Sequence, residues 1–242
     1  MSKIQVLKVK DNSDSYTVKH RLFDMPFRML LCAKSGHGKS NLLTNILCND
    51  KFGYNKIFKA EDIHIWSPTI NEDMKMQIIV DFYDIEDSNL HHEYSEESVE
   101  EVYDSFIEDF EESVQNNKKP SQKLIILDDL SSSGAFSKNR FNTIAKLFCN
   151  SRKFLVNIVL LSQQYTHITP TIRTNSTVIF VFNTNLQSLE AVEADNNYLE
   201  SKKQFLKMFR DNVKTKFQFL CINYSNEYAD LYLDSEFKAI QL

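Results

Sequence analysis

The sequence predicts an α/β fold with a mainly parallel central sheet flanked by helices, plus a C-terminal extension of helices and a hairpin. Short apolar runs, typical of buried strands, alternate along the chain with segments of helical periodicity. Two of these runs are followed by polar sequences that suit phosphate chemistry, Gly-Lys-Ser and Asp-Asp. At 242 residues and 42% hydrophobic composition the chain can bury a sizeable core, so we expect residues 1–242 to form a single domain.

The expected elements follow in order, with no internal repeat and no low-complexity linker. Apolar runs predict strands at residues 3–9, 27–32, 62–68, 123–130, 157–161 and 177–182. Helices are expected at residues 41–47, within an acidic insertion at about 71–119, at 139–150 and at about 186–211. A loop should follow the strand at 157–161, and a hairpin at about 216–233 should complete the extension, which spans about 186–242. Strands that alternate with helices indicate a sheet covered on both faces.

The run at 27–32 leads into a loop with the features of a phosphate-binding P-loop. Residues 33–40 read Ala-Lys-Ser-Gly-His-Gly-Lys-Ser, between the strand at 27–32 and the helix at 41–47. That order of strand, glycine-containing loop and helix is the context the motif requires. Ala33 stands where the motif usually has its first glycine, and alanine is small enough to be tolerated.

The residue types of this loop suit a bound nucleoside triphosphate. Gly36 and Gly38 can adopt positive φ and turn successive N–H groups toward a polyphosphate at a helix N-terminus. Lys39 would reach the β- and γ-phosphates, and the Ser40 hydroxyl would ligate Mg²⁺. The residues expected to contact ATP are Ser35, Gly36, His37, Gly38, Lys39, Ser40 and Asn41.

The run at 123–130 has the pattern of a Walker B strand, because four apolar residues end in Asp128 and Asp129. Asp128 would hold the Mg²⁺ shell, and Asp129 would orient or deprotonate the attacking water. A buried strand that ends in an aspartate-favouring turn would look similar on its own. The P-loop upstream favours the catalytic interpretation.

Gln163 and Gln164 follow the strand at 157–161, at the sheet edge where ligands bind in open α/β folds. A glutamine there can sense the γ-phosphate or position water. A polar residue at this point is also what an ordinary strand end provides, so its weight depends on the neighbouring sequence.

Other features are assigned to the core or to the surface. The four cysteines, which lack C-x-x-C spacing, are read as reduced core thiols in an intracellular setting. No apolar run is long enough to cross a bilayer, and the first residues lack the apolar centre of a signal peptide, so we expect a soluble protein that is not exported. His91, His92 and Glu93 are expected in an exposed loop, and Trp66 and Tyr83 in the core.

Charge is strongly segregated. Residues 61–113 contain eighteen Asp or Glu and one Lys, a balance of −17, which leaves +12 for the rest of a chain whose net charge is −5. Apolar residues recur at helical spacing between 99 and 110, which predicts an amphipathic helix with an acidic, solvated face. A plain surface helix explains this pattern, and a flange that docks a partner or repels DNA is the alternative.

Several blocks together resemble the FtsK–HerA ATPases, and in particular the genome-packaging ATPases of poxviruses, giant DNA viruses and virophages. Residues 147–175 contain an arginine before the strand, a strand ending in Ser-Gln, then Tyr, a proline and Ile-Arg-x-Asn. The Ile-Trp-Ser-Pro-Thr strand at 65–69 and the Leu-Asp-Asp-Leu at 127–130 are also similar to that family. The resemblance covers roughly residues 25–185. It implies a RecA-like motor that forms a homo-oligomeric ring and uses ATP and Mg²⁺ to drive double-stranded DNA into a capsid.

The resemblance also implies roles for single residues. Lys39 and Ser40 would bind phosphate and Mg²⁺, Asp128 would bind Mg²⁺, Asp129 would activate water, and Gln163 would act as sensor. The wider superfamily often has glutamate in place of Asp129, which leaves the fine catalytic geometry open.

Two arginines are candidates for a finger that reaches the nucleotide of a neighbouring subunit. Arg152 falls where members of the superfamily carry such an arginine, and Arg173 is the second candidate. A finger of this kind is worth roughly 10³ to 10⁵ in rate. Either residue could instead be a surface arginine.

DNA contact is expected from loops that face the pore of the ring. The candidates are residues 131–140, with Lys138 and Arg140, and residues 165–171. Contacts to phosphates carry no sequence information, so binding should be non-specific and should weaken steeply with salt. The lysines and arginine between 202 and 216 are more simply read as a solvated helix face.

These observations predict an ATP-hydrolysing DNA translocase that packages a viral genome, with a capsid or vertex protein as a further partner. The resemblance places it in the host cytoplasm at viral assembly sites, or with the virion. A cellular FtsK/HerA-like motor is the alternative in the same class, and a P-loop small-molecule kinase is the alternative in another. A switch GTPase would need Asn-Lys-x-Asp, which the sequence does not contain.

Overall fold

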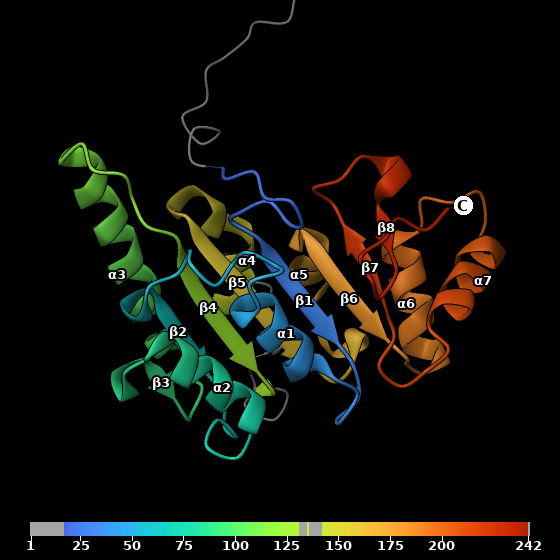
Figure 1. The fold of residues 1–242 in the computed structure, drawn as a ribbon, viewed down its shortest axis with the longest axis horizontal. Coiled ribbons are helices and arrows are strands. Elements are labelled where there is room, and N and C mark those ends of the chain that lie inside the picture. Colours follow the sequence, from blue (N-terminus) through green and yellow to red (C-terminus); the bar gives the residue numbers. More distant parts are fainter. Residues whose placement is uncertain (1–16, 131–134, 136–141, 242) are drawn as a thin grey trace, which may run out of the picture.

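A computed structural model describes residues 17–130, 135 and 142–241 of the chain (Figure 1). The strands of this part are β1 (Arg28–Cys32), β2 (Ile63–Trp66), β3 (Leu90–His91), β4 (Lys123–Asp128), β5 (Val156–Ser162), β6 (Val178–Phe182), β7 (Phe219–Asn223) and β8 (Tyr232–Leu233). They form one sheet in the order β3-β2-β4-β5-β1-β6-β7-β8. The strands from β3 to β6 in that order are parallel, and β7 pairs antiparallel with both β6 and β8.

Helices cover both faces of the sheet. They are α1 (Lys39–Cys48), α2 (Met74–Tyr83), α3 (Glu96–Gln115), α4 (Thr143–Asn150), α5 (Pro170–Asn175), α6 (Leu186–Asn196) and α7 (Lys202–Asn212). One buried cluster contains apolar residues of α1 and α2 with one set of strand residues, and a second contains those of α3 to α7 with the alternate set. Alternation of side chains along each strand therefore places α1 and α2 on one face and the other helices on the opposite face (Figure 1). The predicted α/β class and mainly parallel sheet are confirmed.

The topology brings three chemically important segments together at the carboxyl ends of neighbouring strands. Strands β4, β5 and β1 are adjacent and parallel, with Asp128 beside Leu161 and Leu31 beside Leu161 in the register. Every residue of β4 and β5 is buried, which agrees with their nearly continuous apolar sequences. The segments that follow these strands, which hold the P-loop, the second aspartate and the glutamines, therefore start from neighbouring strand ends.

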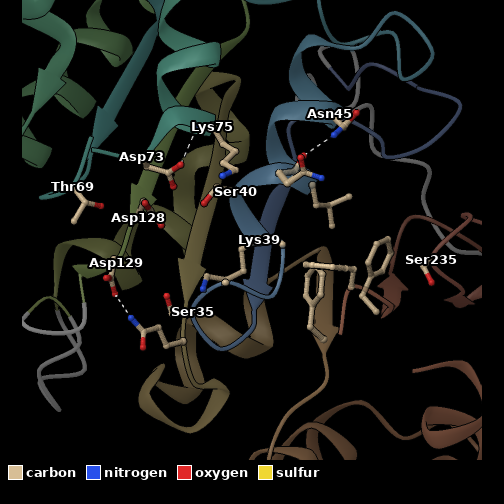
Figure 2. A pocket seen from close by; sticks show the side chains of 18 of the residues that line it. Ser35, Lys39, Ser40, Asn45, Thr69, Asp73, Lys75, Asp128, Asp129 and Ser235 are labelled. Carbon is tan, nitrogen blue, oxygen red and sulfur yellow. Dashed lines mark hydrogen bonds between the residues drawn. The ribbon is translucent and has the colours of Figure 1, made fainter. Parts of the chain in front are cut away.

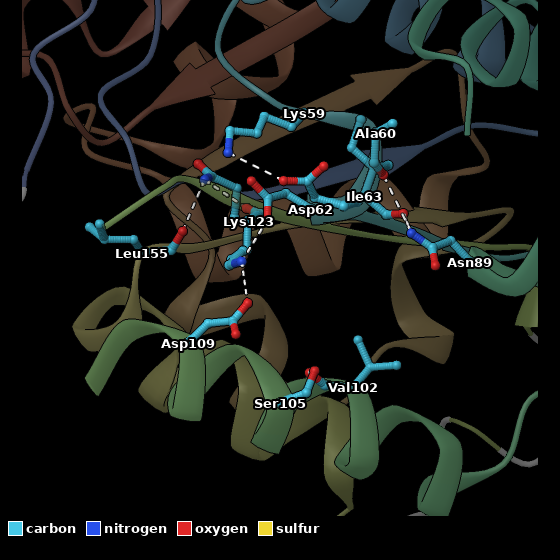
Figure 3. A network of polar contacts seen from close by, with 12 residues as sticks. Lys59, Ala60, Asp62, Ile63, Asn89, Val102, Ser105, Asp109, Lys123 and Leu155 are labelled. Carbon is cyan, nitrogen blue, oxygen red and sulfur yellow. Dashed lines mark hydrogen bonds and ion pairs between the residues drawn. The ribbon is translucent and has the colours of Figure 1, made fainter. Parts of the chain in front are cut away.

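The predicted acidic helix is α3, which begins after Ser95, whose side chain accepts a hydrogen bond from the N–H of Ser98. Val99 and Phe106 are buried, as the spacing predicts. An ion-pair network anchors this helix to the sheet (Figure 3). Lys123 at the start of β4 lies 2.5 Å from Asp62 and 2.7 Å from Asp109 of α3.

Some expected elements differ from those observed. His91 was expected in an exposed loop, but it belongs to β3, where its ring stacks on Trp66 with centroids 4.1 Å apart. The segment expected as a loop after β5 contains the short helix α5, which begins at Pro170. The C-terminal hairpin extends the main sheet through β7.

The remaining elements occur close to the expected positions. Trp66 is fully buried and Tyr83 is 9% exposed, as predicted. Of the cysteines expected in the core, Cys32 and Cys221 are buried, but Cys149 is exposed near the end of α4. The strand expected at 3–9 and the first residues of the helix expected at 139–150 lie outside the described residues. Within the described part, no helix has the length and apolar character needed to span a membrane.

Candidate active site

The loop after β1 has the backbone geometry of a phosphate-binding turn. Gly36 has φ of 70° and Gly38 has φ of 101°, values in the left-handed region that glycine adopts at low cost. Gly38 forms the N-cap of α1. Ala33 is buried and is not among the residues with positive φ, so the alanine in place of the usual glycine causes no backbone strain.

Lys39 lies over this loop at the start of α1. Its ammonium group donates a 2.7 Å hydrogen bond to the carbonyl oxygen of Ala33. Burial lowers the pKa of Lys39, and the charges of Asp128 and Asp129 oppose that shift. The two carboxylates therefore favour the charged lysine that a polyphosphate requires.

Asp128 is the last residue of β4 and is only 5% exposed. Its Oδ2 accepts a 3.2 Å hydrogen bond from the hydroxyl of Ser67, which follows β2. Burial raises the pKa of Asp128 to about 6, while Lys39 and Ser67 act to lower it. A desolvated carboxylate of this kind gains much from a nearby cation.

Asp129 points to a different partner. Its Oδ1 accepts a 3.0 Å hydrogen bond from Nε2 of Gln163, which follows the adjacent strand β5 (Figure 2). The backbone of Asp129 has φ of 49°, in the left-handed region that aspartate tolerates better than most residues. The turn therefore directs two consecutive carboxylates into different surroundings, and Gln163 fixes the orientation of the second.

These groups share a cavity of about 900 Å³ (Figure 2). Of the residues predicted to contact nucleotide, metal or water, those that line it are Ser35, Gly36, Gly38, Lys39, Ser40, Asn41, Asp128, Asp129 and Gln163. Cavity residues that the sequence analysis did not identify are Leu42, Asn45, Phe52, Thr69, Asp73, Lys75, Phe182, Phe217, Phe219, Ser235 and Phe237.

Thr69 and Asp73 enter the cavity from the segment between β2 and α2, and Lys75 enters it from the first turn of α2. The side chain of Asp73 caps α2 by accepting a 2.9 Å hydrogen bond from the N–H of Lys75. The parallel sheet places this segment beside Asp128, because β2 pairs with β4. The sequence signal that could identify this segment is an aspartate at the start of a helical run, soon after the strand expected at 62–68.

His37, Arg152 and Arg173 are not among the residues that line this cavity. Arg173 is mostly buried within its own chain, where it lies 3.1 Å from Asp195 and stacks over the ring of Tyr165 at 4.9 Å. Arg152 is exposed on the short 3₁₀ helix that precedes β5. It therefore lies at the amino end of that strand, away from the carboxyl ends where the cavity is. The pKa of Arg28, at the start of β1, is lowered mainly because Arg28 is buried, and the positive charge of Arg152 lowers it further.

The loops expected to grip DNA are only partly described. Of residues 131–140, which include Lys138 and Arg140, the structure describes Ala135 alone. In the segment 165–171, Tyr165 and Ile168 are buried, and the Tyr165 hydroxyl is 3.0 Å from Asp195. His167 and Pro170 are exposed there. Much of this second segment therefore packs against the protein.

The oxygen atoms around Lys39 suit a magnesium ion. The Ser40 hydroxyl and the Asp128 carboxylate both line the cavity, and Asp128 is desolvated. Mg²⁺ takes one or two protein oxygen ligands and completes its shell with water and substrate phosphates. The donor set is therefore compatible with Mg²⁺ delivered together with a nucleotide.

Comparison with known proteins gives consistent matches. The family model described as "Poxvirus A32 protein" matches residues 15–232. The DNA packaging protein OPG160 of Variola virus is 27% identical over 194 residues, which are 79% of this chain and 66% of that protein. OPG160 of Monkeypox virus is 27% identical over 190 residues, which are 78% of this chain and 59% of that protein. The chain thus spans less than two thirds of the length of these relatives.

Solved structures share the fold. The genome packaging NTPase B204 from Sulfolobus turreted icosahedral virus 2, in complex with AMPPCP, superposes with a TM-score of 0.58 at 15% identity. That match covers 89% of this chain and 98% of B204. The AMP complex of B204 matches with a TM-score of 0.57 at 14% identity, over 83% of this chain and 94% of B204. At these identities the comparison concerns the fold.

Proposed function

This chain belongs to the family of the poxvirus A32 protein, and from that premise we propose that it is an ATPase that packages viral DNA. The observation that carries the proposal is the convergence of Lys39, Ser40, Asp128 and the Asp129–Gln163 pair on one cavity. The named function of the OPG160 relatives supports DNA as the cargo. The AMPPCP complex of B204 supports an adenine nucleotide as the ligand of this fold.

In the proposed reaction, the P-loop binds the triphosphate of ATP. The N–H groups at the start of α1 and the Lys39 ammonium would contact the phosphates, and Ser40 and Asp128, which line the cavity, would hold Mg²⁺. The bound ion would offset negative charge on the transferring phosphoryl group. Lys39 adds its own positive charge at the same point.

Asp129 and Gln163 act on the water. The oxygen of that water forms a bond to the γ-phosphorus while the bond from phosphorus to the bridging oxygen breaks, which yields ADP and phosphate. Asp129 accepts the hydrogen bond of the water and then its proton. Gln163 holds the carboxylate in one orientation through the 3.0 Å hydrogen bond, and the same contact transmits the state of the γ-phosphate to β5.

Several chains would act together in a ring, with double-stranded DNA in the pore. Arg152 lies near the amino ends of the strands, away from the cavity of its own chain. It would therefore contact the nucleotide of a neighbouring copy. Arg173 is already engaged by Asp195 and is the weaker candidate. Segments 131–140 and 165–171 would contact DNA phosphates without reading sequence. The capsid or a vertex protein is the proposed docking partner, at assembly sites in the host cytoplasm.

The test is steady-state ATP hydrolysis by the purified protein and its Lys39→Ala variant. Lys39→Ala should abolish hydrolysis and leave the thermal unfolding midpoint close to that of wild type. Lys146→Ala is a matched control, because Lys146 is exposed and its ammonium pairs with Glu100 on the surface of α3. Wild-type turnover by Lys39→Ala would remove the assignment.

A further inference from the structure

One end of the cavity is aromatic. The phenylalanines that line it are Phe52, Phe182, Phe217, Phe219 and Phe237. Several pack against one another, with ring centroids 5.3 Å apart for Phe182 and Phe219 and 5.4 Å apart for Phe52 and Phe237. Figure 2 shows Ser235 at this end, across the cavity from Asp128 and Asp129, with Lys39 and Ser40 between them.

Phe217 differs from its neighbours because it is 64% exposed. It belongs to the segment between α7 and β7, yet its ring lies against the P-loop. A β-carbon added to Gly38 would be 3.3 Å from Cδ1 of Phe217 and 3.6 Å from Cε1 of Phe182. The adjacent Lys216 places its ammonium 5.4 Å from the centre of the Phe217 ring, and 3.8 Å from the position of a β-carbon on Gly36. An exposed aromatic face therefore stands beside the phosphate-binding turn.

The direction of a bound nucleotide follows from the two ends of the cavity. The γ-phosphate must face Asp128 and Asp129, because the metal-binding and water-activating groups are there. The triphosphate then passes over Lys39 and Ser40, and the nucleoside extends toward the phenylalanines. A planar base buries apolar area against such rings and gains stacking energy.

We propose that the aromatic end is the nucleobase subsite and that Phe217 stacks on the base. This inference rests on the proposed ATP-binding function and assigns to it a part that the P-loop and Walker B motifs do not specify. The C-terminal part of the chain thereby completes a site whose phosphate-binding half lies near residues 33–41.

The same subsite discriminates weakly between purines. Apart from the P-loop, Asn45 and Ser235 are the polar side chains among the described residues that line this end of the cavity, and Lys216 lies beside it against the Phe217 ring. The amide nitrogen of Asn45 already donates a 2.8 Å hydrogen bond to the carbonyl of Asn41. Stacking is tolerant of base identity because every base has an aromatic face. ATP and GTP should therefore bind with affinities within about tenfold of each other, since selectivity on the order of 10⁴ arises where a site pairs substrate polar groups.

The test compares binding of ATP, GTP and inorganic tripolyphosphate, each with Mg²⁺, by titration calorimetry. Phe217→Ala should weaken the binding of ATP and GTP about 5- to 150-fold, which is the range expected for one stacked base. It should leave tripolyphosphate affinity unchanged, because that ligand has no base. Phe217→Trp should restore nucleotide affinity. Tyr228→Ala is the matched control, since Tyr228 is 72% exposed and does not line this cavity.

The outcomes separate this inference from the proposed function. Unchanged ATP affinity in Phe217→Ala overturns the base subsite, and so does an equal loss for tripolyphosphate, which would assign Phe217 to the shape of the P-loop. A preference for one purine above 100-fold overturns the weak discrimination. If wild type binds neither ATP nor tripolyphosphate, or if Lys39→Ala binds them equally well, the proposed function itself fails.

Discussion

Asp128 and Asp129 are consecutive residues with different surroundings. Asp128 is buried and bonded to Ser67, whereas Asp129 is partly exposed and bonded to Gln163. The positive φ of Asp129 rotates its side chain away from the strand direction that Asp128 follows. The left-handed backbone conformation of Asp129 is therefore enough to give the two carboxylates different roles. The buried Asp128 would lie near the metal, and the more exposed Asp129 would lie near the water.

Asp129→Asn tests this division. The variant keeps the size of the side chain and its contact with Gln163, but an amide cannot accept a proton. We expect Mg·ATP affinity close to wild type and turnover reduced by about 10² to 10⁴, the usual contribution of a general base. Calorimetry and steady-state hydrolysis measure the two quantities. Loss of binding with residual turnover would mean that the roles of Asp128 and Asp129 are exchanged.

At this scale the sequence predicts the residues that belong to local motifs. Asp128 ends a recognisable strand, and Lys39 and Gln163 come after two others. The structure places all three around one cavity, while their roles remain predictions. Lys75 and Phe217 reach the cavity from segments with no motif of their own. Their positions depend on strand order and on the path of the chain after α7, which no local pattern specifies.

At the scale of elements, Lys123 joins β4, the turn before β2 and the acidic helix α3 (Figure 3). Its side chain is 7% exposed and that of Asp62 is 2% exposed, whereas Asp109 is 60% exposed. Oδ2 of Asp62 is buried without a hydrogen-bond partner among the described atoms. Lys123 therefore compensates a carboxylate that has little other stabilisation.

Lys123→Ala should lower the free energy of unfolding by about 3–5 kcal/mol, because it leaves the charge of Asp62 buried and unpaired. Lys146→Ala breaks an exposed pair with Glu100 and should lower the free energy of unfolding far less, because solvent and salt screen an exposed ion pair. Urea denaturation of both variants measures the difference. Equal, small losses would show that the network contributes no more than a surface ion pair.

A second element, the edge strand β3, depends on neutral histidines. His64 lies 3.1 Å from His91, whose ring stacks on Trp66. Burial lowers the pKa of His64 to about 4, and the charges of His91 and Lys123 act in the same direction. The unfolded chain, with a histidine pKa near 6.5, binds the proton more readily than the folded one.

The free energy of unfolding should therefore fall as pH decreases from about 6.5 to about 4, and this contribution should level off below pH 4. Because His64 is only partly buried, we expect a loss of about 1–3 kcal/mol from this group. Urea denaturation across that pH range, compared with His64→Asn, isolates the effect. Parallel curves for the two proteins would contradict it.

Periodicity predicts the longer elements well, and α3 buries Val99 and Phe106 as its spacing indicates. It does not predict β3, because two residues give no pattern. Periodicity also predicts the C-terminal hairpin, but it does not predict that the hairpin pairs with β6. The antiparallel pairing of β7 with β6 joins strands that α6 and α7 separate in the sequence, so no local pattern specifies it.

At the scale of the whole molecule, the acidic and basic helices are far apart, and so are the nucleotide cavity and Arg152. The acidic helix α3 and the basic helix α7 stand at opposite ends of the sheet (Figure 1). The cavity lies at the carboxyl ends of the strands, while Arg152 lies near their amino ends. A single copy therefore cannot present Arg152 to its own nucleotide, and assembly would be needed to bring the two together.

Mixing experiments test this arrangement. Arg152→Ala and Lys39→Ala should each be inactive alone, but a mixture should recover part of the wild-type rate, because an intact P-loop can meet an intact arginine across an interface. Lys153→Ala, at the next exposed position, should keep its activity. Absence of any gain on mixing would argue against a finger that acts between subunits.

The central claim is that ATP hydrolysis at this site is coupled to double-stranded DNA. The most direct measurement is steady-state hydrolysis with and without long double-stranded DNA across a salt series, with Lys39→Ala as background. We predict that DNA stimulates hydrolysis and that this stimulation declines steeply as the salt concentration rises. The logarithm of the apparent DNA affinity should fall linearly with the logarithm of the salt concentration, because contacts to phosphates release counterions. A brisk rate that is indifferent to DNA at every salt concentration would contradict the account.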